Sequence, residues 1–433
     1  MADLRTGISV QRERAILTAA LLPDLGLDER HPLAELGALA ETAGAQAVGE
    51  VTQARQRPDP STFIGSGKVD ELAGLAKLTD ADVVIFENDL SPAQLRNVEQ
   101  VVERKVIDRS ELILDIFASR ARTHEARLQV ELAQLEYTYP RLRAMWSHLE
   151  RIAGGAPAGI GTRGPGEQQL EIDRRIVQRR TAELRREIER IQGRKQREVA
   201  QRNTDFFTVG LVGYTNAGKS TLFNTLTAGD VYADDRLFAT LDTRTRRWDL
   251  GGGDGVMLSD TVGFVRHLPH HLVASFRATL EESIHSDLLL IVLDVSDPES
   301  PSHADTVAQV LAEIGAADQP RLVLLNKIDR LEDQAALASW AGRNAHALPV
   351  SARAGLGLDR LVEAVRSHQR GAELELTLRL SMQEGKAMGF LENRSTVHDR
   401  RYDTTHVDMD VRIGKRQLDQ LRATGAKFDI VSK

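Results

Sequence analysis

One glycine-rich loop constrains the fold of this chain more than any other feature. Residues 213–220 read Gly213-Tyr-Thr-Asn-Ala-Gly-Lys-Ser220, after the apolar run Phe207–Val212 and before a helical pattern that begins at Thr221. A strand, a glycine-rich loop and a helix in this order form a phosphate cradle, because glycines let backbone N–H groups turn inward and the helix start adds a positive dipole end. The order therefore predicts an α/β domain that binds a nucleoside triphosphate.

The loop and the residues beyond it carry the predicted phosphate and metal contacts. Lys219 is expected to reach the β- and γ-phosphates, and the Ser220 hydroxyl is expected to ligate Mg²⁺. Thr240, in the run Phe238–Asp242, is the candidate for a second hydroxyl on Mg²⁺. The nucleotide-binding candidates in this part of the chain are Gly213, Tyr214, Thr215, Asn216, Ala217, Gly218, Lys219, Ser220 and Thr221.

A motif further along the chain predicts which base the nucleotide carries. Asn326-Lys-Ile-Asp329 follows the apolar run Arg321–Leu325. The Asp329 carboxylate can accept hydrogen bonds from both the N1–H and the exocyclic amine of guanine, whereas adenine presents an acceptor at N1. A site that hydrogen-bonds its substrate in this way rejects the wrong analogue by roughly 10⁴–10⁵. Asn326, Lys327 and Asp329 are therefore candidate guanine-binding residues.

Two further motifs complete the predicted guanine-nucleotide site. Asp260-Thr-Val-Gly263 places the Asp260 carboxylate near Mg²⁺ and the Gly263 N–H near the γ-phosphate. Val350-Ser-Ala-Arg353 is expected to offer backbone N–H groups to the base carbonyl. Any one motif alone fits an ordinary strand-to-loop turn, but five in the correct order indicate a GTP-binding domain. The Val350–Arg353 motif adds Ser351, Ala352 and Arg353 to the candidate nucleotide-binding residues. The candidate catalytic residues are Lys219, Thr240 and Gly263.

Length and composition exclude several classes of protein. At 433 residues the chain is too long for one ordinary core, and about three domains are expected. The net charge of −7 argues against a protein that coats nucleic acid, although arginines crowd residues 141–197, where a local basic surface can dominate contact with phosphate. The absence of cysteine excludes disulfides and thiolate zinc sites. No stretch is long enough to span a membrane and no secretion signal is recognisable, so the cytoplasm is the expected compartment.

The N-terminal part of the chain alternates strand and helix patterns. Ala15–Leu21, Gln46–Val51 and Val83–Phe86 are predicted strands. A helix is expected near residues 33–43, and another after Ser91-Pro92, where the serine caps the helix and the proline opens it. This alternation predicts a small α/β domain with a largely parallel sheet.

The middle of the chain carries two heptad-like series. Apolar residues from Leu128 to Leu149 alternate spacings of four and three, and a second series runs from Val177 to Ile191. Together they predict an antiparallel helical hairpin, in which Pro140 kinks or splits the first helix. The connecting stretch 154–166 is too rich in glycine and proline for a helix, and Arg163 suits insertion against RNA or a nucleotide.

After Arg370 the pattern changes to strand-like alternation. Residues 374–380 and 407–413 alternate apolar and polar side chains, as half-buried strands do, and residues 416–421 predict a closing helix. The chain is therefore predicted to hold an N-terminal α/β domain over 1–120, a long antiparallel helical hairpin with a glycine-rich loop over 121–203, a P-loop GTPase domain over 204–370 and a small C-terminal α+β domain over 371–433.

Taken together, these motifs resemble the HflX-type GTPases. Beyond the loop 213–220, the resemblance rests on Phe63–Lys68, Gly159–Glu167, Leu237–Asp242 and Asp260–Phe264. It implies a bacterial-type, ribosome-associated GTPase that uses GTP and Mg²⁺ and binds the large ribosomal subunit and its ribosomal RNA. It also implies a role in separating stalled ribosomes under heat stress. A second, ATP-related activity at Phe63–Lys68 is allowed by the family, although that segment fits an ordinary helix start equally well.

The residue after the Asp260–Gly263 motif affects the expected rate of hydrolysis. Phe264 stands where many GTPases place the glutamine that orients the attacking water. A phenylalanine side chain neither donates nor accepts such a hydrogen bond, so the isolated protein is expected to hydrolyse GTP slowly until the ribosome completes the site.

Asn216 has two interpretations. In related GTPases an asparagine at this position helps hold a potassium ion; the alternative is that Asn216 is simply a turn residue with a left-handed backbone. We interpret His267, His270 and His271 as solvent-facing side chains rather than as a metal site.

Two other functions remain open at this point. A small-molecule kinase could use the same Lys219 and Ser220, but it would not need Asp329 to recognise a guanine base. A GTP-gated module that regulates a protein or RNA partner without remodelling it needs the same switch, so the sequence does not separate it from a ribosome-splitting factor. The oligomeric state also stays open, with a monomer as the default.

Overall fold

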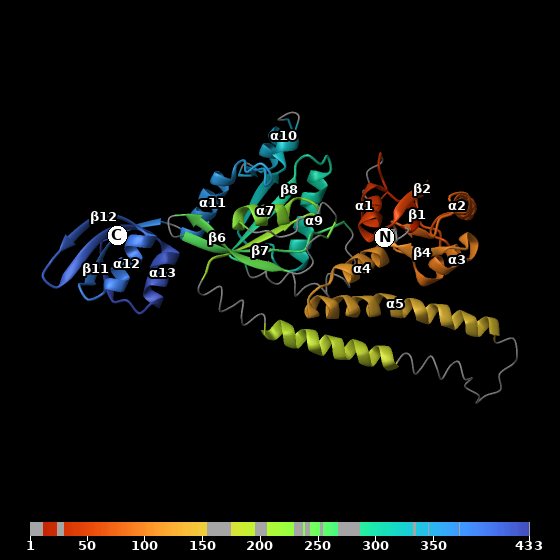
Figure 1. Cartoon of the computed structure of the whole chain (residues 1–433), viewed down its shortest axis with the longest axis horizontal. Helices are drawn as coiled ribbons and strands as arrows, with labels where there is room; N and C mark the ends of the chain where they lie inside the picture. Colours follow the sequence, from red (N-terminus) through yellow and green to blue (C-terminus); the bar gives the residue numbers. More distant parts are fainter. Residues whose placement is uncertain are drawn as a thin grey trace, which may run out of the picture. The chain divides into compact units, whose positions relative to one another are not determined.

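The computed structural model describes residues 12–23, 30–153, 175–194, 206–228, 237–238, 243–251, 254–266, 286–331, 335–344, 346–371 and 373–432. The chain divides into two compact units, each described by itself below. Figure 1 shows their helices and strands, coloured along the sequence. The first holds the described residues up to 194 together with Leu237 and Phe238, and the second holds the rest. The predicted domain boundaries at 120, 203 and 370 stay predictions.

The first unit begins with strands and helices that alternate along the chain. They are β1 (Arg14–Leu21), α1 (Ala34–Ala43), β2 (Gln46–Ala54), α2 (Ser66–Leu78), β3 (Val83–Phe86), α3 (Pro92–Val102), β4 (Lys105–Asp108) and α4 (Arg109–Arg120). The strands form a parallel sheet in the order β2-β1-β3-β4. Ser91 caps α3 in a reciprocal capping box with Gln94. The predicted α/β domain is confirmed.

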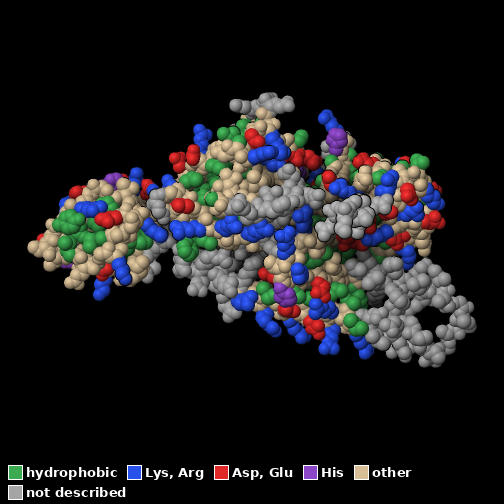
Figure 2. Space-filling model, viewed as in Figure 1, with side chains coloured by type: hydrophobic (Ala, Val, Ile, Leu, Met, Phe, Trp, Pro, Cys, Tyr) green, Lys and Arg blue, Asp and Glu red, His purple; other side chains and the backbone are tan. Residues whose placement is uncertain are grey.

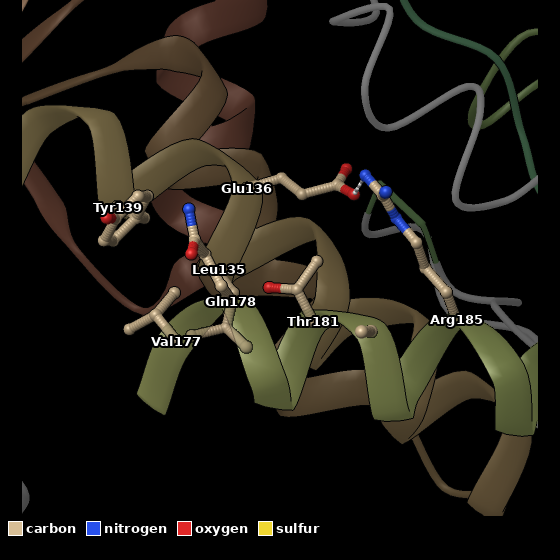
Figure 3. A pocket seen from close by; sticks show the side chains of 8 residues that line it. Leu135, Glu136, Tyr139, Val177, Gln178, Thr181 and Arg185 are labelled. Carbon is tan, nitrogen blue, oxygen red and sulfur yellow. Dashed lines mark hydrogen bonds and ion pairs between the residues drawn. The ribbon is translucent and has the colours of Figure 1, made fainter. Parts of the chain in front are cut away.

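A helical hairpin follows in the same unit. It consists of α5 (His124–Ala153) and a second helix over residues 175–194. His124 contacts Glu187 at 3.0 Å and Glu131 contacts Arg180 at 2.7 Å, so the helices run antiparallel, as predicted. Beside these contacts the helices leave a pocket lined by apolar and polar side chains (Figure 3). The two predicted apolar series meet in one cluster formed by Leu128, Leu132, Leu184 and Ile188.

Pro140 does not split α5, which runs unbroken from His124 to Ala153. Of the two outcomes predicted at Pro140, the split is wrong, because a proline removes one hydrogen bond of a helix while the turns on both sides of it keep theirs. The predicted kink stays a prediction. The glycine-rich stretch that carries Arg163 lies outside the described residues.

The second unit contains the sheet that carries the phosphate loop. Its elements are β5 (Thr208–Gly213), α7 (Lys219–Thr227), β6 (Arg244–Gly251), β7 (Asp254–Asp260), β8 (Leu288–Asp294), α9 (Ser300–Glu313), β9 (Arg321–Asn326), the 3-10 turn η1 (Ile328–Arg330), α10 (Ala335–Arg343), β10 (Leu348–Pro349) and α11 (Leu358–Arg370). The strand order is β10-β9-β8-β5-β7-β6, with β6 antiparallel to β7 and the other described pairs parallel. Since β5 lies between β8 and β7, the loop leaves the sheet at the carboxyl ends of its inner strands, where open α/β sheets bind ligands.

A small antiparallel sheet with two helices ends this unit. Its elements are β11 (Glu373–Ser381), α12 (Gly385–Arg394), β12 (Thr396–Tyr402), β13 (His406–Gly414), α13 (Lys415–Ala423) and β14 (Phe428–Ser432), with the strand order β12-β13-β11-β14. Leu378 of β11 and Met409 of β13 share a core with Leu391 and Leu421 of the two helices. The predicted α+β domain is confirmed. Across the described residues, no helix has the length and apolarity needed to cross a bilayer.

Candidate nucleotide site

The phosphate loop runs from the end of β5 to the start of α7 and approaches its neighbours closely. At Gly218 the backbone is left-handed, with φ of 93°, and a Cβ there would lie 2.3 Å from Asn326 Nδ2. At Gly213 a Cβ would lie 2.3 Å from the carbonyl oxygen of Val292. Both positions therefore require glycine, which explains why the loop carries glycines at these two places.

Lys219 is buried beneath the loop, with 6% of its surface exposed. Its Nζ donates to the carbonyl oxygen of Gly213 at 3.1 Å and to that of Tyr214 at 2.8 Å. Burial lowers the pKa of Lys219 to about 8, an effect that Asp260 opposes and Lys327 reinforces through their charges. A phosphate group beside Nζ would favour the charged form again, so this ammonium group is suited to bind anions.

Nucleotide affinity is expected to fall as the pH rises above about 8, the pKa of Lys219 in the folded protein. The charged ammonium attracts phosphates and the neutral amine does not, so the affinity falls by up to about tenfold per pH unit. The stability of the nucleotide-free protein changes in the opposite direction. The folded pKa lies below the ordinary value of 10.5, so the unfolded chain binds more protons and the free energy of unfolding rises between pH 8 and 10.5.

Titration of GDP affinity between pH 7 and 9 measures the first effect. Lys219→Arg keeps its charge over this range and corrects for any titration of the base itself. Equal slopes for the wild type and this variant would rule the prediction out.

Ser220 and Asp260 meet at the start of α7. Ser220 Oγ donates to Asp260 Oδ2 at 2.8 Å, and Asp260 is fully buried at the end of β7. A hydroxyl and a carboxylate side by side form the kind of oxygen-rich set that Mg²⁺ prefers, so these two residues fit the predicted ion. Bound Mg²⁺ would neutralise charge on the phosphates. The other predicted ligand, Thr240, lies outside the described residues, as do His267, His270 and His271.

Asn326 joins the guanine motif to the phosphate loop. It ends β9 with 1% of its surface exposed. Its Nδ2 donates to the carbonyl oxygen of Ala217 at 2.8 Å, and its Oδ1 accepts from the Ala352 N–H at 3.0 Å. The Ala352 N–H, which the sequence predicts to face the base carbonyl, is therefore bonded to Asn326. One side chain ties three motifs together, a role that no sequence pattern indicated.

Asp329 is exposed in η1, where a base can reach it. Its Oδ1 accepts a hydrogen bond from Ser351 Oγ at 2.6 Å, and this bond is the main cause of the lowered pKa of Asp329. The charge of Arg353 lowers that pKa further. The carboxylate is therefore held ionised and oriented as an acceptor, with Ser351 as its positioning residue. Lys327 pairs with Asp294 at 2.6 Å and fixes the start of the same turn.

The segment after β7 lies against the phosphate loop. Thr215 N–H donates to the Phe264 carbonyl oxygen at 2.7 Å, and Phe264 N–H donates to that of Gly213 at 3.1 Å. A Cβ on Gly263 would lie 3.0 Å from Lys219 Nζ, so the backbone at this position comes close to the lysine because it carries no side chain. Two of the predicted catalytic residues are therefore brought together, while the Phe264 side chain is buried.

Tyr214 makes contacts that the sequence did not indicate. Its ring stacks on His303 of α9, with centroids 3.8 Å apart and 12° between the ring planes. Its hydroxyl accepts from the Arg266 N–H at 2.9 Å, and Arg266 Nη2 pairs with Glu299 at 2.7 Å. Tyr214 therefore anchors Arg266 to the phosphate loop, through partners that no local sequence pattern marks.

Two predicted roles retain simpler alternatives in the structure. Asn216 is exposed with φ of 59°, as a left-handed turn residue would be. Its role in holding potassium stays a prediction. Equal rates of GTP hydrolysis in sodium and potassium buffers would exclude that role.

The segment 63–68 fits an ordinary helix start. Gly65 precedes the first turn of α2 and Lys68 Nζ pairs with Glu71 at 2.7 Å, which favours the helix-start interpretation. The ATP-related activity there also stays a prediction.

Three family models match the chain one after another. The model described as GTP-binding GTPase N-terminal covers residues 30–118, GTP-binding GTPase Middle Region covers 120–202, and 50S ribosome-binding GTPase covers 208–327. Among solved structures, a GTP-binding protein from the hyperthermophilic archaeon Sulfolobus solfataricus in complex with GDP aligns over 82% of this chain and 98% of its own, at 24% identity and a TM-score of 0.44. A likeness at that level supports no comparison of domain arrangement.

Curated relatives match most of the chain at higher identity. GTPase HflX of Escherichia coli (strain K12) is 48% identical over 358 residues, which are 82% of this chain and 83% of its own. GTPase HflX of Caldanaerobacter subterraneus subsp. tengcongensis is 39% identical over 98% of this chain and 96% of its own. The chain therefore belongs to the HflX family of GTPases, enzymes that bind and hydrolyse GTP.

Proposed function

We propose that this GTPase binds the large ribosomal subunit and its ribosomal RNA and separates stalled ribosomes into subunits under stress. We also propose the nucleotide-binding, Mg²⁺-binding and catalytic roles described above for individual residues of the nucleotide site. The observation that carries it is the packing of Leu237 and Phe238, shortly before Thr240 in the sequence, within the first unit, where Phe238 meets the helix that also contacts the hairpin. The match of residues 208–327 to a model described as 50S ribosome-binding GTPase supports the choice of partner.

Phe238 anchors the stretch before Thr240. Its ring meets that of Phe117 in α4 edge to face, with centroids 4.6 Å apart and 81° between the planes, and both rings are buried. Leu237 N–H donates to Thr42 Oγ1 in α1 at 3.3 Å. Thr240 follows Phe238 by two residues, which span at most about 7 Å of extended chain, so a nucleotide that engaged Thr240 would pull on this anchor. Binding of GTP is therefore expected to act on the first unit.

The helix that receives Phe238 is firmly joined to its neighbours. The N-cap of α4, Asp108, accepts a hydrogen bond from Tyr137 of α5 in the hairpin. Arg109 of α4 pairs with Glu87 and Glu35, each at 2.7 Å, and is itself buried. Removing one partner from a buried ion pair costs about 3–5 kcal/mol, so these pairs hold α4 firmly to α1 and to the end of β3. This connection supports a hairpin whose position depends on the bound nucleotide.

The hairpin offers a basic surface of the kind that RNA binds. Arg180 and Arg185 pair with Glu131 and Glu136 across the two helices, at 2.7 and 2.8 Å, so these two charges stabilise the hairpin itself. Five further exposed arginines of the helix 175–194 follow one another at spacings of four and seven, which places them along one face of the helix, and Arg179 among them also pairs with Glu183 at 3.1 Å. Figure 2 shows Lys and Arg side chains, mixed with acidic ones, on the surface of the hairpin. Such a face attracts phosphates even when the whole chain is acidic. Its members are Arg175, Arg179, Arg186, Arg190 and Arg194.

Sedimentation of intact ribosomes tests the proposal. The ribosomes are mixed with the protein and either GTP, GDP or a non-hydrolysable GTP analogue. Growth of the free-subunit peaks with GTP or the analogue, but not with GDP, is the expected result. Co-migration without dissociation would favour the alternative, a GTP-gated binding module, and failure to co-migrate in any nucleotide state would contradict both. A cytoplasmic monomer is part of the proposal, and a native mass of two chains would contradict that part.

A further inference from the structure

His303 contacts the phosphate loop although it belongs to none of the nucleotide motifs. It lies near the start of α9 and is buried, as is Tyr214. The two rings are stacked, with centroids 3.8 Å apart and 12° between their planes. At this distance the rings are in van der Waals contact. His303 therefore covers one face of the Tyr214 ring and keeps that ring from swinging toward α9.

Tyr214 connects this contact to the phosphate loop at both ends of the residue. Its carbonyl oxygen accepts a hydrogen bond from Lys219 Nζ at 2.8 Å. Its hydroxyl, at the far end of the ring, accepts from the Arg266 N–H at 2.9 Å. The direction of the ring decides where that hydroxyl lies, so a change at His303 would displace the acceptor of the Arg266 N–H.

The segment tied to Tyr214 is the one that follows Gly263. Phe264 pairs with Tyr214 in a short parallel β-bridge, and the bond from the Arg266 N–H adds a second tie two residues further on. A Cβ on Gly263 would lie 3.0 Å from Lys219 Nζ, so the backbone at Gly263 and the lysine are neighbours. Tyr214 therefore helps to set the spacing between the two groups expected to hold the γ-phosphate.

His303 also lies beside the second residue that holds Arg266. Its Nε2 is 4.0 Å from Glu299 Oε2, and the same carboxylate oxygen accepts from Arg266 Nη2 at 2.7 Å. On the other side of the ring, His303 Nδ1 is 3.9 Å from Asp297 Oδ2. Arg266 is thus held through its main chain by Tyr214 and through its side chain by Glu299, and His303 is next to both partners.

We propose that His303 is a positioning residue for GTP hydrolysis, which acts through Tyr214 on the segment that follows Gly263. The inference rests on the roles proposed for Lys219 and Gly263 and is independent of any ribosomal role. A misplacement of about 1 Å can lower the rate of a reaction about a hundredfold, so loss of the His303 ring should slow the chemical step by about ten- to a hundredfold. GDP carries no γ-phosphate, and its affinity should change by less than about threefold.

The test compares His303→Leu with His303→Phe. Leucine has a similar volume without a flat ring, whereas phenylalanine keeps a flat ring that can stack on Tyr214. Single-turnover GTP hydrolysis, GDP affinity and the Tm of the nucleotide-free protein are measured with the full chain in the absence of ribosomes. Leucine is expected to slow hydrolysis and to leave GDP affinity in place, and phenylalanine is expected to keep the rate within about threefold of the wild type. Equally slow hydrolysis in both variants would overturn stacking as the link.

Combination with Tyr214→Phe shows whether His303 acts through Tyr214. This variant keeps the ring but lacks the hydroxyl that accepts from the Arg266 N–H. Residues that act in one chain of contacts have non-additive effects. His303→Leu should therefore slow Tyr214→Phe much less than it slows the wild type, and losses that simply multiply would contradict the inference.

A matched control comes from the same helix. Val310 is buried in α9, two turns beyond His303, and belongs to no nucleotide motif. Val310→Ala should lower the Tm and leave both the rate of hydrolysis and GDP affinity as they are. An unchanged rate in His303→Leu, beside a slow Lys219→Ala, would overturn this inference and leave the role of the lysine intact. A parallel fall of Tm, GDP affinity and rate in His303→Leu would overturn it too, because that outcome marks a purely structural residue.

Discussion

Replacing Asp329 by asparagine is expected to change the preferred base from guanine to xanthine. In the structure the Asp329 carboxylate is held by Ser351 at 2.6 Å and kept ionised by that bond. Guanine would give it two donors, the N1–H and the exocyclic amine. An asparagine presents one acceptor and one donor instead, which matches the N1–H and the C2 carbonyl of xanthine but places two donors against each other in guanine. A mismatch of this kind leaves buried groups unpaired, and the preference should change by roughly 10³ or more.

Competition between GDP and XDP for the wild type and Asp329→Asn measures the change. The wild type should bind GDP tightly and XDP weakly, and the variant should show the reverse order. Asp305→Asn is a suitable control, since Asp305 is exposed in α9 and belongs to no nucleotide motif. If Asp329→Asn kept the selectivity of the wild type, the guanine motif would have to lie elsewhere.

Removing the Lys219 side chain is expected to abolish most of the hydrolysis of GTP. Lys219 Nζ is held at the centre of the loop by two carbonyl oxygens, next to Gly263. It is the cation expected to stabilise the charge that develops on the transferred phosphoryl group. Deleting one such donor from a preorganised site lowers the rate by roughly 10²–10³, and the loss of phosphate binding adds to this effect.

Single-turnover hydrolysis at saturating protein concentration separates the two effects of Lys219→Ala, because it measures the chemical step apart from binding. Lys427→Ala provides a control, since Lys427 is an exposed lysine between α13 and β14. A rate within about threefold of the wild type for Lys219→Ala would mean that another group carries the charge.

The parts of the fold that local patterns specify were predictable from the sequence. Strands such as Val83–Phe86 are continuous apolar runs, and the Ser91-Pro92 pair marks a helix start through its own chemistry. The order of Lys219, Asp260 and Asp329 along the chain was enough to predict one site, because each motif follows a strand and parallel strands end at the same edge of a sheet.

The contacts that connect these motifs were not predictable, because they join residues far apart in the sequence. Asn326 braces the loop through Ala217, Tyr214 stacks on His303, and Phe238 packs on Phe117. Each contact depends on the final packing of two elements, and the local sequence pattern around one partner does not predict the other. The exposed strand β12 escaped prediction for a related reason, since it has no buried face to impose an apolar alternation.

The rate of GTP hydrolysis with and without large ribosomal subunits tests the central claim most directly. Phe264 replaces the water-orienting glutamine of many GTPases, and its side chain is buried. The isolated protein should therefore hydrolyse GTP slowly, and large subunits should accelerate it at least about a hundredfold by supplying or ordering the missing transition-state contacts. A rate that is the same in the presence and absence of large subunits would contradict this account.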